Sequence, residues 1–316
     1  MRHLKTRLLA GILILFTAAN VVAYNHAWRM SHFVSGGIRT QVPEKLSGLS
    51  KIGVLVMGVT IPKPVNLRKP SDVGLPYRTL IIPGGSTEQL EAWAIESAAT
   101  RNWVLLFAGY AGVKSQLLEE AAEFRTMGFN VLLVDLPGSG GSSGSTTSIG
   151  YHEGADVAAS WRYAVANLHP QKIFLYGRSM GAASVIRAVS AFGAQPSGVI
   201  LECPFDWLLD TVANRFRIMG IPAFPGAQAI VFWASVQQRT NYFDYSLSRE
   251  AARVSCPALL MAGQNDTRAT VPEARAVFDA LKGKKEWLLF EGAGHQQYLT
   301  YNREEWRGAV KRLVIN

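Results

Sequence analysis

The segment 177–181, Gly-Arg-Ser-Met-Gly, has the composition of a catalytic turn. It follows the apolar run Lys172–Tyr176 and precedes a helical stretch from Ala182 to Phe192. A G-x-S-x-G turn between a strand and a helix holds its serine in a strained conformation that exposes the hydroxyl, and glycines keep side chains out of the adjacent backbone. Ser179 is therefore the candidate nucleophile, with an ordinary glycine-flanked turn as the alternative.

A serine hydroxyl is a weak nucleophile and needs a general base that is oriented by a third group. Two later loops each follow an apolar run and carry a residue of the required type. Asp266 lies after the run 257–262, and His295 lies after the run 287–291. Of the six histidines, His295 alone follows a late strand, so we expect it to be the base and Asp266 to orient it.

Other acids compete with Asp266 for this role. Asp135 also follows an apolar run but precedes the serine, and the glycines after it indicate a part in fixing a turn. Glu202 ends the run 198–202 and remains an alternative acid, with Asp206 and Asp210 as weaker ones.

Acyl transfer also needs hydrogen-bond donors for the developing oxyanion. The amide of Met180, directly after the nucleophile, is the first expected donor. The second is the amide of Tyr110 in the loop 109–112, Gly-Tyr-Ala-Gly, where glycines let the backbone approach a substrate oxygen.

Two glycine-rich segments resemble nucleotide-binding loops but lack the required spacing. Val113 occupies the glycine position of a P-loop in the segment 109–115, and Ser143 breaks the dinucleotide pattern in the segment 138–144. No cluster of His, Cys, Asp or Glu has metal-ligand spacing. We therefore expect neither a cofactor nor a metal.

Short apolar runs alternate with helical patterns along the chain after residue 95. The runs are continuous, as in strands buried on both faces, and this alternation predicts a mostly parallel sheet with helices on both sides. A hairpin formed by 77–82 and 89–95 precedes them. The predicted strands are Trp103–Ala108, Asn130–Leu136, Lys172–Tyr176, Gly198–Glu202, Pro257–Ala262 and Glu286–Glu291.

The pattern predicts three regions, of which the largest is a catalytic domain over 77–316. Residues 204–250 interrupt the strand–helix alternation and are rich in bulky apolar side chains, so we interpret them as a cap insertion. The cap either binds an acyl chain or simply packs its aromatic residues onto the core. Residues 31–76 are expected to be a tether with one short strand, Ile52 to Val59.

Residues 1–30 have the pattern of an export signal, because Arg2, Lys5 and Arg7 precede an apolar run that ends near Ala23. We expect an uncleaved membrane anchor with a cytoplasmic N-terminus and an extracytoplasmic catalytic domain. The alternative is cleavage after Ala23, which would release a soluble exported protein.

The net charge of +9 is concentrated near the N-terminus. Residues 1–50 hold six Lys or Arg and one acid, which leaves +4 for the remaining 266 residues. A nucleic-acid binder needs a basic face on its folded domain, so this class is excluded. The two cysteines, Cys203 and Cys256, are predicted at opposite ends of strands and are expected to be unpaired.

Five motifs in this order resemble the α/β-hydrolases, in particular the serine aminopeptidase-like branch with an N-terminal anchor and a short cap. They are the segments 108–112, 135–140, 177–181 and 263–266, and Gly294-His295. That branch includes membrane-associated depalmitoylases and lysophospholipid lipases. One departure is that Ala108 and Tyr110 occupy the usual His and Asn positions of the oxyanion loop.

The resemblance implies an enzyme that cleaves carboxylic esters or thioesters of hydrophobic or acyl-bearing substrates through an acyl-enzyme. A serine peptidase is the enzymatic alternative, and a catalytically inactive binding module is the non-enzymatic one. The physiological ester and the oligomeric state are not predicted.

Overall fold

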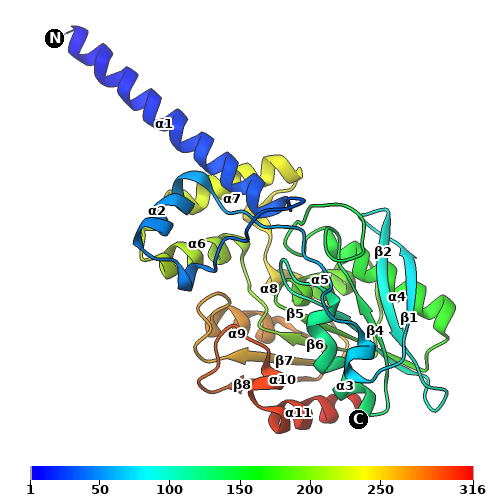
Figure 1. Ribbon diagram of the computed structural model, residues 1–316. Helices are drawn as coiled ribbons and strands as arrows, with labels where there is room; N and C mark the ends of the chain where they lie inside the picture. The colour runs from blue at the N-terminus through cyan, green and yellow to red at the C-terminus, as the bar shows by residue number, and fades with distance from the viewer. Residues whose placement is uncertain (1, 316) are drawn as a thin grey trace. The chain divides into compact units, whose positions relative to one another are not determined.

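The computed structural model describes residues 2–315. The chain folds into two compact units. The helical unit contains the chain up to Pro62 together with Leu208–Asp244. The sheet unit contains Lys63–Trp207 and the chain from Tyr245 onward. The N-terminal segment and most of the predicted cap, which are far apart in the sequence, thus belong to the same unit (Figure 1).

The sheet unit is built on eight strands in the order β1-β2-β4-β3-β5-β6-β7-β8. The β1–β2 and β2–β4 pairs are antiparallel, and every later pair is parallel. This confirms the predicted fold class. The strands are β1 Arg78–Pro83, β2 Gln89–Ile95, β3 Asn102–Phe107, β4 Asn130–Val134, β5 Lys172–Arg178, β6 Gly198–Glu202, β7 Ala258–Gly263 and β8 Lys285–Phe290.

Burial on both faces explains the continuous apolar runs of the central strands. Every residue of β4, β6 and β7 is buried. In register across the sheet, Leu105 of β3 pairs with Leu132 of β4 and with Leu175 of β5. These leucines have no exposed surface, so they form the centre of the core.

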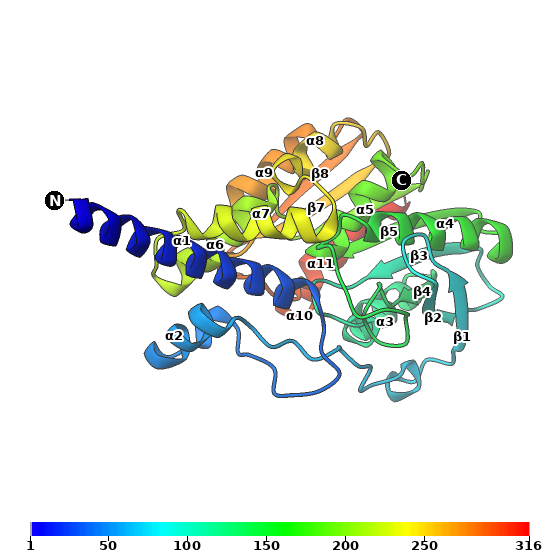
Figure 2. The same ribbon diagram turned by 90° about the horizontal axis from the view of Figure 1, so that it is seen from above.

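Helices cover both faces of the sheet (Figure 2). The helices α4, α5, α8 and α9 contact one another in succession on one face, whereas α3, α10 and α11 lie on the other. Their bounds are α3 Leu118–Thr126, α4 Glu153–Leu168, α5 Met180–Ser190, α8 Leu247–Ala251, α9 Val271–Ala280, α10 Tyr298–Tyr301 and α11 Arg303–Ile315.

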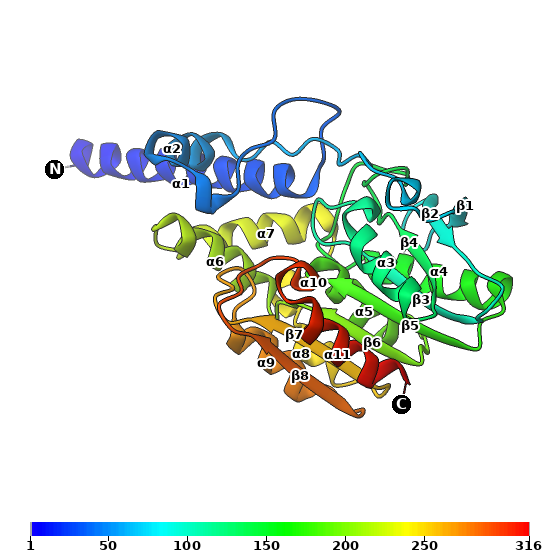
Figure 3. The same ribbon diagram turned by 60° about the horizontal axis from the view of Figure 1, so that its bottom comes forward.

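The helical unit is built around α1, which is long and apolar enough to cross a membrane by length and composition. Helix α7 runs alongside α1 (Figure 3). Trp233 of α7 donates its indole hydrogen to Asn20 at 3.1 Å and packs edge-on against Tyr24. The α-helices of this unit are α1 Arg2–Ser31, α2 Gly48–Met57, α6 Leu208–Met219 and α7 Gly226–Gln238.

The prediction of a short strand from Ile52 to Val59 is wrong, because most of this segment belongs to helix α2. Periodicity alone does not distinguish a short apolar strand from a helix. The local sequence supports the helical state, since Gly58 ends α2 with a φ of 78° and donates its amide hydrogen to Val54 O.

Candidate active site

The nucleophile turn has the strained geometry that its sequence predicts. Ser179 lies between β5 and α5 with φ 53° and ψ −115°. A Cβ atom at position 177 would lie 2.4 Å from the carbonyl carbon of Gly181, and one at position 181 would lie 2.3 Å from Phe107 O. Both glycines are therefore required by close backbone approach, which explains the G-x-S-x-G spacing.

The loop after β3 passes directly beside Ser179. A Cβ atom on Gly109 would lie 3.2 Å from Arg178 O and 3.4 Å from the Cβ of Ser179. Tyr110 follows Gly109 in this loop, and Met180 is the first residue of α5, where a helix leaves its amide hydrogen without an intrahelical acceptor. The two expected oxyanion donors thus belong to segments that flank Ser179.

A buried ion-pair network anchors this loop. Lys114 is fully buried, and its ammonium contacts the carboxylates of Asp135 and Glu91. Asp135 also accepts the backbone amide of Lys114 at 2.8 Å and the side-chain amide of Asn66 at 2.7 Å. Asp135 also accepts the backbone amide of Gly141 at 3.1 Å, so it fixes the glycine-rich turn that follows it, as expected from the sequence.

The structure brings the other two predicted site residues together. His295 donates its Nδ1 hydrogen to Asp266 Oδ2 at 2.7 Å. The other oxygen of Asp266 accepts the backbone amides of Arg268 at 2.8 Å and Ala269 at 2.9 Å. The Asp266 side chain is inaccessible to solvent, whereas that of His295 is 20% exposed. The acid is buried and fully bonded, and the imidazole remains accessible.

Direct contacts hold the Asp266 and His295 loops against each other. Asn265 donates its backbone amide to Ala293 O at 2.8 Å, and Gln264 donates its own to Phe290 O at 3.0 Å. A Cβ atom on Gly263 would lie 2.6 Å from Gly294 O, so this contact needs a glycine.

Among the described residues, the hydroxyl of Ser179 makes no hydrogen bond to His295. Catalytic hydrogen bonds are often long without substrate and shorten in the reacting complex. The alternative acid, Glu202, accepts the indole hydrogen of Trp306 at 2.6 Å and does not contact His295. The geometry thus joins His295 to Asp266, and the assignment of all three catalytic roles remains a prediction.

Cys203 also lies beside this pair, which the sequence reasoning did not anticipate. Its sulfur and one ligand atom each of Asp266 and His295 lie within 4.8 Å of one another. The three types are possible zinc ligands. However, both Asp266 oxygens already accept hydrogen bonds, and burial raises the pKa of the Cys203 thiol well above its usual value. We therefore assign no metal here, and both cysteines are free, as expected.

A second buried network lies beneath the nucleophile turn. Glu120 of α3 accepts hydrogen bonds from Gln297, whose amide nitrogen lies 2.7 Å from each carboxylate oxygen. Burial raises the pKa of Glu120, and Arg178 partly offsets this effect. Burial and the nearby Glu120 raise the pKa of Glu202 to about 7. The carboxyls of Glu120 and Glu202 thus both interact with the guanidinium of Arg178, the residue that precedes Ser179.

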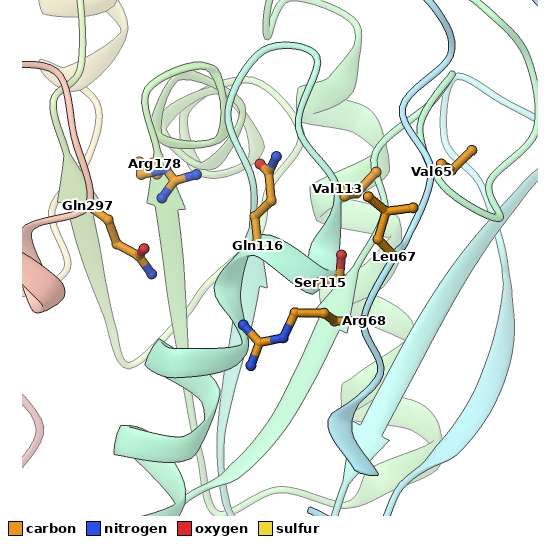
Figure 4. Close-up of a pocket in the computed structure, with 8 residues that line it drawn as sticks. All are labelled: Val65, Leu67, Arg68, Val113, Ser115, Gln116, Arg178 and Gln297. Carbon is orange, nitrogen blue, oxygen red and sulfur yellow. The ribbon is translucent and has the colours of Figure 1, made fainter. Parts of the chain in front are cut away.

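A pocket of about 470 Å³ is lined by residues that lie close in the sequence to Ser179, to the loop 109–112 and to His295 (Figure 4). Arg178 precedes Ser179, Gln116 lies beyond the oxyanion loop, and Gln297 follows His295 by two positions. Polar side chains, among them the guanidinium groups of Arg68 and Arg178, therefore line this pocket, and none of the candidate catalytic residues is among its lining residues. The lining residues are Val65, Leu67, Arg68, Val113, Ser115, Gln116, Arg178 and Gln297.

Comparisons with known proteins agree with this arrangement. Residues 98–231 match the family described as Serine aminopeptidase, S33. An esterase of Pyrococcus furiosus, Pf2001, superposes with a TM-score of 0.66 at 22% identity and covers 80% of this chain and 96% of its own. The sheet order and this superposition show that the chain has the α/β-hydrolase fold, and the family match covers part of it.

Two curated relatives are similar in sequence. The uncharacterized protein YqkD of Bacillus subtilis is 23% identical over 75% of this chain and 78% of its own length. The uncharacterized membrane protein YNL320W of Saccharomyces cerevisiae is 31% identical over 43% of this chain and 48% of its own length.

Proposed function

We propose that this α/β-hydrolase is a serine esterase that cleaves carboxylic esters or thioesters through an acyl-enzyme. The observation that carries the proposal is the 2.7 Å hydrogen bond from His295 to the buried Asp266, in loops at the same sheet edge as the strained Ser179 turn. Nothing in folding requires a buried acid, an accessible imidazole and a strained serine at one edge of the sheet.

In this mechanism Ser179 attacks the substrate carbonyl carbon and His295 Nε2 takes the hydroxyl proton. Asp266 holds the imidazole in the tautomer with hydrogen on Nδ1 and stabilises the imidazolium. The amides of Met180 and Tyr110 bind the oxyanion, and His295 returns the proton to the leaving oxygen or sulfur. Water, activated by the same imidazole, then attacks the acyl carbon and restores the serine.

The pocket lined by Arg178 and Gln297 would suit polar groups of a substrate. The sequence suggested an acyl pocket beneath the cap aromatics. Trp233, however, packs on Tyr24 within the helical unit, and Phe224 is 75% exposed. The cap aromatics thus give no support for a long acyl chain, and a chain-length series of esters would decide its presence.

Hydrolysis of p-nitrophenyl esters tests the proposal against its alternatives. We expect p-nitrophenyl butyrate to be cleaved and the Ser179→Ala variant to lose at least about 10³-fold in kcat/KM. Cleavage of peptide p-nitroanilides in preference to esters would indicate a peptidase. A folded wild-type protein without activity on either substrate would indicate a binding module.

We also propose that α1 anchors the protein in a membrane with its N-terminus in the cytoplasm and the sheet unit outside. Support comes from the basic side chains before the apolar segment 8–23 and from the similarity to a yeast membrane protein. N-terminal sequencing of the mature protein provides the test. A soluble chain that begins at Tyr24 would contradict the anchor.

A further inference from the structure

Helix α2 is an apolar helix that buries none of its residues. The exposed fractions are 85% for Leu49, 59% for Ile52, 57% for Val56 and 63% for Met57. Contiguous apolar surface of this kind on a folded protein marks a site of contact with a partner or a membrane.

The position of α2 along α1 indicates which of these it is. Asn25 donates its side-chain amide to Met57 O at 2.9 Å, and His26 contacts Leu55 O at 2.9 Å. Residues 25 and 26 lie about 3–5 Å beyond Ala23, at a rise of about 1.5 Å per residue. The carboxyl end of α2 is therefore attached where the apolar segment of α1 ends.

Helix α7 lies beside the apolar segment itself. Trp233 donates a hydrogen bond to the side chain of Asn20, and Gln237 donates one to Tyr24 O at 3.0 Å. In both pairs the two residues are 213 positions apart in the sequence. Helices α1 and α7 consequently run in parallel. The same offset of 213 places Gly226, the first residue of α7, at the level of Leu13 of α1. Between Arg217 and Arg239 the chain has no Lys, Arg, Asp or Glu.

A surface of α7 beside its contact with α1 is also apolar. Phe232 and Val236 are 50% and 52% exposed and lie four residues apart, on one face of the helix. Phe224, just before α7, is 75% exposed. We call the exposed residues of α2 and α7 the collar: Leu49, Ile52, Val56, Met57, Phe224, Phe232 and Val236.

The charge of the helical unit favours a lipid surface over a second copy of the chain. The unit contains ten Lys or Arg against three Asp or Glu, and therefore +7 of the total +9. Two copies with this charge repel each other, whereas anionic headgroups attract basic side chains next to an apolar surface.

We propose that the collar is embedded in an anionic bilayer, so that α2 and α7 face lipid alongside α1. This rests on the proposed anchoring of α1, which it extends from a single helix to the whole helical unit. Apolar side chains of α2 and α7 contact acyl chains, and the basic side chains contact headgroups.

Depth-dependent fluorescence quenching tests this proposal in the full-length chain, reconstituted at one copy per lipid nanodisc. A Cys256→Ser background leaves only Cys203, which is 2% exposed, and the labelled background protein corrects for it. The environment-sensitive dye NBD is attached at Phe224→Cys, the collar position. Brominated phosphatidylcholine with phosphatidylglycerol provides the quencher.

We expect the dye at position 224 to emit at shorter wavelength than in water and to lose more than half of its intensity to brominated acyl chains. A matched control is Asn241→Cys, an exposed position beyond the far end of α7, where the same register predicts little quenching. Equal and water-like emission at positions 224 and 241 would contradict the proposal that the collar is embedded in lipid.

A third probe separates failure of the collar from failure of the anchor. Leu15→Cys lies in the apolar segment of α1. Quenching at position 15 without quenching at 224 refutes the collar and leaves the anchor intact, and absence of quenching at both refutes both. Shielding of the 224 probe only in discs with two copies would identify a second chain as the occupant and contradict the proposal.

Discussion

His295 and Asp266 are joined by a 2.7 Å hydrogen bond although 29 residues separate them in the chain. One Asp266 oxygen accepts this bond, and the other accepts two backbone amides of its own loop. The carboxylate therefore has a fixed orientation, and through it the imidazole has a fixed tautomer.

The Asp266→Asn variant tests this orientation. Its amide side chain would present a donor or a poorer acceptor to Nδ1, so the wrong tautomer would face Ser179. We expect kcat for p-nitrophenyl butyrate to fall by about three to four orders of magnitude with KM little changed. Asp279→Asn, at an exposed position of α9, is the control and should retain wild-type kcat. Retained activity in Asp266→Asn would assign the acid elsewhere.

The turn glycine Gly181 is required by packing. In Gly181→Ala the new Cβ would lie 2.3 Å from Phe107 O and 2.8 Å from Ala108 O, both of which are backbone atoms. We expect a loss of about 1–3 kcal/mol in the free energy of unfolding, measured by urea denaturation. Gly308→Ala in α11 is the control, because its nearest contact is the flexible end of Arg312 at 3.5 Å. The control should be neutral or slightly stabilising, and an equal loss in both variants would argue against the close approach.

The ion-pair network under the oxyanion loop predicts a strong effect of removing its cation. Lys114→Met leaves the buried Asp135 carboxylate without its cation and should cost about 3–5 kcal/mol of unfolding free energy. The control, Arg68→Met, breaks an exposed pair with Glu119 and should cost less than about 1 kcal/mol. Thermal or urea denaturation measures both, and a small effect of Lys114→Met would show that the network does not hold the loop.

The pKa of Glu202 predicts a pH dependence of stability. Because the folded state raises this pKa from 4.5 to about 7, the folded protein binds more protons than the unfolded chain between these values. The contribution of Glu202 to the free energy of unfolding is therefore greatest below pH 4.5, and it is lost as the pH rises toward about 7. Burial and Glu120 oppose ionisation of Glu202, whereas Trp306, Arg178 and Tyr176 favour it.

The Glu202→Gln variant keeps an acceptor for Trp306 and removes the titration. We expect the decline in stability between pH 4.5 and about 7, measured by urea denaturation at each pH, to be shallower in this variant. The exposed Glu96→Gln provides the control and should retain the wild-type slope. A wild-type slope in Glu202→Gln would mean that other groups cause the decline.

The candidate catalytic positions could be predicted from the sequence because each follows an apolar run that forms a parallel strand, and parallel strands end at one edge of a sheet. The turn glycines and the strands β3 to β8 followed from the same pattern. By contrast, Glu120 and Gln297 are 177 residues apart, and no local pattern joins them. The side chain of Cys203 approaches Asp266 only through tertiary packing, and α2 is too short for periodicity to distinguish helix from strand.

The most direct test of the central claim is covalent labelling of the folded protein with a fluorophosphonate, followed by mass spectrometry of its peptides. The probe reacts with a serine activated by a neighbouring base, and Ser179 is the residue whose geometry fits that role. We predict one adduct, on Ser179, in wild-type protein, and none in His295→Ala or Ser179→Ala. An adduct on another residue, or an unlabelled wild-type protein with an intact fold, would contradict the account.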